Sequence, residues 1–117
     1  MKTYSARFVS LFILLCSSMF SASAFATGPA CEVQDATVTS IVTWVDGTTF
    51  VILNRENNCG CSQKTRFGIP ASATHAKSYI AQAMLAYATD SKVFVYGAGG
   101  CTVHGSTPDL YSISLKK

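Results

Sequence analysis

The clearest pattern along the chain is a run of β-branched and aromatic residues that predicts a first strand over 37–45. An Asp-Gly pair at 46–47 follows and predicts a tight hairpin turn, because Gly adopts positive φ freely and Asp tolerates it. Residues 48–53 then predict the return strand. A two-residue turn would pair Val45 with Thr48 and would fix the register of the whole hairpin.

Both faces of this predicted hairpin are apolar. In that register Ile41, Phe50 and Ile52 share one face, and Trp44 and Val51 lie on the other with Val38, Val42 and Leu53. We therefore expect one face to form the domain core and the other to be covered by a helix or another subunit. Trp44 is expected in the core or in an interface rather than as a ligand platform.

The rest of the chain predicts three more strands, over 62–69 (ended by Pro70), 92–96 and 110–115. It also predicts one helix, between the first two of these strands, which ends at Thr89. Ser72 or Thr74 can cap this helix. An apolar stripe at helical spacing is expected to face the core, and it consists of Ala76, Ile80, Ala83, Met84 and Tyr87. The other side is also largely apolar, through Ala81, Leu85, Ala86 and Ala88. Such a helix is buried on more than one side, against a neighbouring subunit or within its own barrel.

The resulting order is β-β-β-α-β-β. It predicts a mainly β fold with α+β content, a five-stranded OB-fold-like barrel with one helix between the third and fourth strands. A β-grasp fold or a small α+β sandwich is the main alternative.

The first 26 residues have the pattern of a secretory signal peptide. Lys2 and Arg7 precede a short apolar run over 8–16, and small residues lead to an Ala-Phe-Ala site at 24–26. Cleavage after Ala24 is the alternative, and a transmembrane anchor is disfavoured because the run is shorter than the ~20 residues of a span. We expect residues 27–117 to form a single exported domain, secreted or periplasmic, with no membrane span.

Composition supports one folded domain. Of 117 residues, 49% are hydrophobic and 13% are charged, which excludes a disordered tail or a coiled coil. The net charge of +3 falls to +1 when Lys2 and Arg7 leave with the signal peptide. A nearly neutral domain lacks the basic surface of a nucleic-acid-binding protein, so no nucleic-acid partner is expected.

Four cysteines remain after residue 26, and an even number in an exported chain predicts two disulfides with three possible connectivities. In the OB-fold topology the start of the first strand and the second and fourth connections meet at one end. There we favour Cys61–Cys101 together with Cys31–Cys59. A zinc site that includes His104 is the alternative, but its Cys-x-Cys spacing is weak. Neither a metal nor a cofactor is expected.

The connection between the last two strands is the candidate ligand site. Its polar side chains suit hydrogen bonding to sugars and, with the neighbouring Tyr111, they are Thr102, His104, Ser106, Thr107 and Asp109. We expect function in this loop rather than in the hairpin tip, where two residues cannot shape a pocket. His104, Ser106 and Asp109 are the residue types of a catalytic triad, but one loop rarely holds all three in register, so no catalytic residues are expected.

The layout resembles the receptor-binding B subunits of AB5 toxins, of the subtilase-cytotoxin and typhoid-toxin type. The shared features are the signal peptide, a small OB barrel, a helix followed by a Thr/Ser-containing turn over 87–93, and a cysteine in a loop. Small exported bacterial proteins of unknown function also look similar, with a Phe-Gly-Ile-Pro strand end like 67–70 and a loop like 96–101. The toxin resemblance implies a pentameric ring with helices at its centre, glycan binding and a catalytic A subunit. The family's glycan-contacting serine, ahead of the first strand, has no counterpart in 32–37.

Taken together, these patterns predict an exported, non-enzymatic binding module that is oligomeric and recognises glycans. The alternative is a monomeric, disulfide-stabilised periplasmic protein with a structural or inhibitory role.

Overall fold

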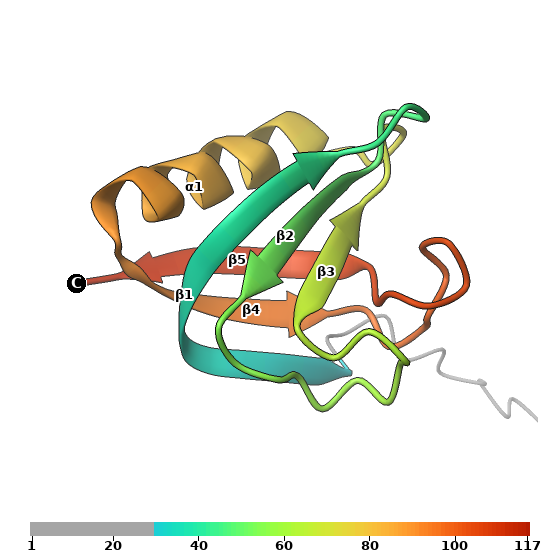
Figure 1. The fold of residues 1–117 in the computed structure, drawn as a ribbon, viewed down its shortest axis with the longest axis horizontal. Coiled ribbons are helices and arrows are strands. Elements are labelled where there is room, and N and C mark those ends of the chain that lie inside the picture. The colour runs from blue at the N-terminus through green and yellow to red at the C-terminus, as the bar shows by residue number, and fades with distance from the viewer. Residues whose placement is uncertain (1–29) are drawn as a thin grey trace, which may run out of the picture.

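A long, bent first strand organises the fold (Figure 1). The computed structural model describes residues 30–117, so the predicted signal peptide over 1–26 lies outside the described residues. The elements are β1 (Cys31–Thr43), β2 (Thr49–Leu53), β3 (Arg66–Ile69), α1 (Ala76–Thr89), β4 (Lys92–Gly97) and β5 (Leu110–Lys116). The first half of β1 pairs with β4 and the second half pairs with β2. One strand thereby belongs to both halves of the sheet.

The early start of β1 differs from the prediction, which began this strand at residue 37. Cys31 and Val33 are buried and alternate with more exposed residues, and Ala36 resumes the buried face after a bulge. Asp35 lies in this bulge with a left-handed φ of 51°. A bulge bends a strand, and its extra residue breaks the two-residue alternation on which the sequence prediction depends.

The five strands form one antiparallel sheet in the order β3-β2-β1-β4-β5, with α1 between β3 and β4. This confirms the predicted mainly β order of elements. The sheet is not a closed barrel, because its edge strands β3 and β5 do not pair with each other within residues 30–117. An isolated bridge joins Gly68 of β3 to Asp109, the residue before β5. The third strand is also shorter than predicted, since pairing begins at Arg66 rather than near Ser62.

The core lies between the concave side of the sheet and α1, which packs mainly against β1 and β5 (Figure 1). Its buried members are Val33, Ala36, Val38, Val51, Leu53, Phe67, Ile69, Ala83, Ala86, Val93, Val95, Leu110 and Ile113. The helix contributes its small alanines, which let its backbone approach the sheet closely. Among residues 30–117, no helix is both long and apolar enough to cross a lipid bilayer.

The predicted helix face is only partly correct. Ala76, Ile80 and Ala83 pack against the core as expected, but Met84 and Tyr87 are more than half exposed. Ala86 and Tyr79 occupy the inner face in their place. The helix also starts later than predicted, with His75 at the N-cap position and no side-chain cap from Ser72 or Thr74.

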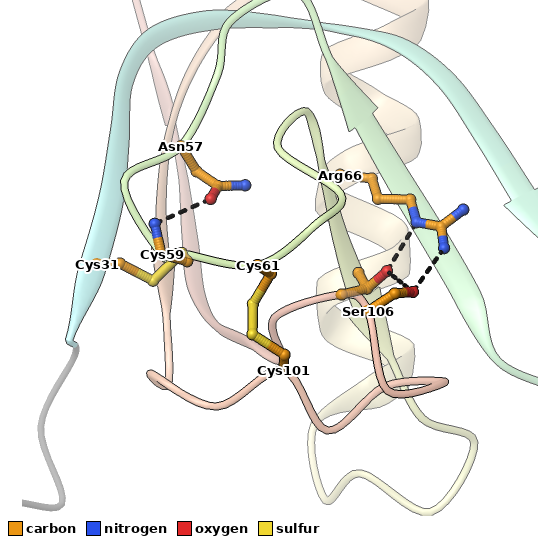
Figure 2. Close-up of a disulfide and its surroundings, with 8 residues drawn as sticks. Cys31, Asn57, Cys59, Cys61, Arg66, Cys101 and Ser106 are labelled. Carbon is orange, nitrogen blue, oxygen red and sulfur yellow. Dashed lines mark hydrogen bonds between the residues drawn. A yellow bond between two sulfur atoms is a disulfide. The ribbon is translucent and has the colours of Figure 1, made fainter.

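Both disulfides form with the favoured pairing (Figure 2). Cys31–Cys59 joins the start of β1 to the β2–β3 loop across a Cα–Cα distance of 4.9 Å. Cys61–Cys101 joins that loop to the β4–β5 loop across 5.6 Å. These bonds occupy all four sulfur atoms and therefore exclude the alternative zinc site. They bring the start of β1 and two separate loops together at one end of the sheet.

Candidate functional site

The β1–β2 hairpin has a three-residue turn rather than the predicted two-residue turn. Trp44 N–H donates to Thr48 O at 2.8 Å and Gly47 N–H donates to Trp44 O at 2.9 Å. Gly47 has a left-handed φ of 85°, as expected for a three-residue hairpin loop with a bulge. The register consequently pairs Val42 with Phe50. This places Trp44 and Phe50 together on the convex face, away from the core cluster.

The β4–β5 loop covers that convex face. Phe50 is buried although it belongs to no part of the core cluster. Its register partner Gly68 has no side chain, and a Cβ there would lie 2.6 Å from Val103 Cγ1. The loop can therefore rest directly on the sheet. The expectation that a helix or a second subunit covers this face is wrong at Phe50, because the chain's own loop does so.

His104 lies at the tip of this loop in an unusual backbone conformation. His104 and Gly105 have φ values of 52° and 69°, and Ser106 N–H donates to Val103 O at 3.2 Å. These are the features of a type I′ turn, which needs positive φ at both central residues. The turn aims the imidazole at the hairpin tip.

At the hairpin tip, His104 meets Asp46 and Trp44. Its Nε2–H donates to Oδ2 of Asp46 at 2.7 Å, and its ring lies edge-on to the Trp44 ring with centroids 5.1 Å apart. Oδ1 of Asp46 accepts the Thr48 N–H at 2.9 Å. Two hydrogen bonds hold the pKa of Asp46 below its ordinary value of 3.8. The larger effect comes from the Thr48 backbone N–H, and the second comes from the His104 side chain. The carboxylate is thus ionised at neutral pH and already oriented.

Arg66 ties the loop to β3 on the same face (Figure 2). Its Nε–H donates to Thr107 Oγ1 at 2.7 Å and its NH2 group donates to Ser106 Oγ at 3.3 Å. The guanidinium also lies 4.3 Å from the centroid of the Phe50 ring, a cation–π contact. Thr107 is fully buried and anchors the loop through its hydrogen bond with Arg66, and its predicted ligand contact stays a prediction.

We name the surface made by Trp44, Asp46, Arg66, His104 and Ser106 the loop face. Trp44 is its most accessible aromatic ring, 49% exposed, so it does not lie in the core, and its alternative place in an interface stays a prediction. The loop and the hairpin tip form one surface, since His104 and Asp46 are in direct contact, and the expectation that function lies in the loop rather than in the tip stays a prediction. The turn is one residue longer than predicted, and this changes which residues of β2 share a face with Trp44.

The predicted ligand residues divide between two surfaces. His104 and Ser106 join the loop face, and Thr102 is exposed further back on the loop. Asp109 and Tyr111 instead line a groove beside α1. The triad residue types do not combine, because His104 bonds to Asp46 and Ser106 bonds to Arg66. Within residues 30–117, no group of three His, Cys, Asp or Glu side chains could hold a metal ion.

The loop face combines a flat, half-exposed ring with fixed hydrogen-bonding groups. A tryptophan ring offers an apolar surface against which a sugar ring can stack, and the adjacent carboxylate, imidazole and hydroxyl can bond to its hydroxyl groups. OB folds bind oligosaccharides through this part of the sheet and its adjoining loops. The chain matches no protein-family model and no curated protein sequence.

Proposed function

We propose that this protein is an exported, non-enzymatic module that binds glycans at the loop face. The observation that carries the proposal is the Trp44 ring, half exposed and flanked by the His104–Asp46 pair. Val42 and Val45, close to Trp44 in the chain, are exposed too, and an exposed apolar surface rimmed by polar groups commonly marks an interaction or ligand site. Export is supported by the two disulfides, which persist in oxidising compartments such as the periplasm or the exterior.

The rigidity of the site favours binding of a ligand whose individual contacts are weak. Asp46 accepts two hydrogen bonds, Arg66 makes two, and Cys61–Cys101 anchors the loop. Groups that are ordered before binding lose little entropy when a ligand arrives. A small polar ligand such as an oligosaccharide gains most from such an arrangement.

Self-association is the second part of the proposal. Met84, Leu85 and Tyr87 on α1 are each more than half exposed, and Ala81 and Ala88 are exposed beside them. An apolar surface of this kind suits contact with a second copy of the chain. Several loop faces on one assembly would supply avidity for clustered glycans. By resemblance to toxin B subunits, the assembly would be a pentamer that carries a catalytic A subunit.

One feature favours the alternative function. Val45 projects fully into solvent at the hairpin tip, as expected of a loop presented to a protein partner by a monomeric inhibitor. Size-exclusion chromatography with light scattering separates these two functions. A monomer that binds no glycan would favour the inhibitor.

A glycan array tests the proposal directly. The oxidised protein, displayed on a multivalent carrier, is expected to bind a restricted set of oligosaccharides. His104→Asn should lose most of that signal, because Asn tolerates the left-handed backbone of residue 104 but removes the imidazole. Val45→Ala, at the hairpin tip that His104 contacts, is the matched control and should bind normally. An array without signal, or one unchanged by His104→Asn, would overturn the proposal.

A further inference from the structure

A groove of about 550 Å³ lies between α1 and the start of β5, separate from the loop face. Its polar and aromatic lining consists of Ser72, Thr74, His75, Tyr79, Asp109 and Tyr111. The volume is within the usual range of small-ligand sites. No residue of the loop face lines this groove, so a ligand here would be distinct from the proposed glycan.

Asp109 brings an uncompensated carboxylate to the groove. The backbone of this residue is fixed, since its carbonyl oxygen accepts the Ala98 N–H at 3.0 Å and the residue bridges to Gly68. Its Oδ1 is buried, yet it has no hydrogen-bond partner within residues 30–117. Buried polar atoms without partners are few in native proteins, and each requires an explanation. A ligand that donates a hydrogen bond once the Asp109 side chain turns toward the groove is one.

Two tyrosines fix the shape of the groove. The Tyr79 hydroxyl donates to the Tyr111 carbonyl oxygen at 2.7 Å and braces α1 against β5. The His75 ring lies edge-on to the Tyr79 ring with centroids 6.1 Å apart. The Tyr111 side chain remains partly exposed. Aromatic faces attract cations, so these rings and the carboxylate favour the same kind of ligand.

We propose that the groove binds a primary ammonium group. Asp109 supplies the opposite charge and the tyrosine rings supply cation–π contact. An anion is disfavoured because no Lys or Arg lines the groove. A metal ion is disfavoured because the described residues place no cluster of three ligating side chains there. The ammonium group comes either from a free amine or from the lysine side chain of a peptide.

Nuclear magnetic resonance titration of the ¹⁵N-labelled, oxidised protein tests this site. Butylammonium chloride should cause saturable shifts at the amides of Ala98, Tyr111 and residues 75–79, whereas butanol at the same ionic strength should not. Asp109→Asn should weaken binding by about tenfold or more, through loss of the opposite charge. Asp90→Asn is the matched control, since it makes the same charge change at the other end of α1, and it should leave the affinity unchanged.

Two further arms complete the experiment. A lysine capped as its N-acetyl methylamide should bind more tightly than butylammonium if the natural source is a peptide, and equally if it is a free amine. Tyr111→Ser keeps the backbone carbonyl that Tyr79 needs and should weaken binding about two- to fivefold. The absence of saturable shifts up to about 50 mM amine would overturn the proposal. So would equal shifts with butanol, or an affinity unaffected by both Asp109→Asn and Tyr111→Ser.

Discussion

His104 shows how a single residue shapes the loop face. A non-glycine residue in the left-handed region costs on the order of 1–3 kcal/mol, although histidine is among the residue types that tolerate it. The cost is offset by the hydrogen bond to Asp46 and by contacts with Trp44 and Phe50. Backbone strain of this kind gathers at ligand sites, where the position of one side chain matters more than local stability.

The carboxylate of Asp46 makes the hairpin tip sensitive to acid. Its pKa is below the ordinary 3.8 because of Thr48 and His104, so its contribution to stability is present above pH 3.8 and is lost as pH falls through the lowered pKa. We expect the Thr48 amide resonance to titrate with a midpoint below 3.8. Asp46→Asn should abolish the transition. A midpoint at or above the ordinary value would contradict the hydrogen-bonded geometry.

Gly97 is required by the packing of the first disulfide. A Cβ at this position would lie 2.5 Å from Cys31 Sγ and 3.0 Å from Cys59 Sγ. We expect Gly97→Ala to lower the free energy of unfolding by roughly 1–3 kcal/mol, the usual cost of overpacking, as measured by urea denaturation. Gly100→Ala, in the exposed part of the loop, should change it by less than about 0.5 kcal/mol. Equal effects would mean that the close approach is relieved without cost.

At the scale of elements, the hairpin explains which part of the fold the sequence could predict. The existence and order of the strands and of α1 followed from the sequence pattern, although β1 starts earlier and β3 starts later than predicted. The register did not, because an Asp-Gly pair fits both two- and three-residue turns. One residue of difference exchanges the two faces of a strand relative to its partner, so Trp44 and Phe50, predicted on opposite faces, share one face. Only packing against His104 and Arg66, distant in the sequence, decides between these registers.

For helix α1, the sequence left open which face packs against the core. Apolar residues surround it, so periodicity could not separate an inner face of Ala83 and Ala86 from an outer face with Met84 and Leu85. The alanines are inside because the helix lies close to the sheet, where larger side chains do not fit. The sequence therefore predicted the helix but not its rotation about its own axis.

The outer face of α1 gives a prediction for assembly. Leu85 is more than half exposed in the single chain, so Leu85→Glu should leave the fold intact. A charge at the centre of an interface is not tolerated, and light scattering should show loss of the oligomer. Ser62→Glu, in the exposed β2–β3 loop, should assemble normally. A wild-type protein that stays monomeric at high concentration would contradict self-association.

At the scale of the whole molecule, the two disulfides replace barrel closure. Within residues 30–117, the edge strands β3 and β5 do not pair, and an isolated bridge links Gly68 to Asp109 just before β5. The disulfides join β1, the β2–β3 loop and the β4–β5 loop. The position of the loop face depends on this arrangement, because Cys101 lies in the same loop as His104 and ties that loop to the β2–β3 loop. Sequence reasoning found that loop through its polar residues, but its contact with the hairpin is a property of the assembled fold.

The disulfides give a prediction for stability. The protein, unfolded without reductant, should contain no free thiol among Cys31, Cys59, Cys61 and Cys101. Reduction should lower the free energy of unfolding by about 2–5 kcal/mol per bond, as measured by denaturant titration with and without reductant. Four reactive thiols in the unreduced protein would contradict the structure at this end of the sheet.

The most direct test of the loop face compares two aromatic residues on different surfaces. Isothermal titration calorimetry would measure the affinity of an array-selected neutral oligosaccharide for the wild type, Trp44→Ala and Tyr111→Ala, each checked for its fold by near-ultraviolet circular dichroism. We expect Trp44→Ala to weaken binding by about tenfold or more, equivalent to roughly 1.4 kcal/mol, because the stacking surface is lost. Tyr111→Ala, in the groove, should bind as the wild type does. The opposite order, with Tyr111→Ala weakened and Trp44→Ala unchanged, would contradict glycan binding at the loop face.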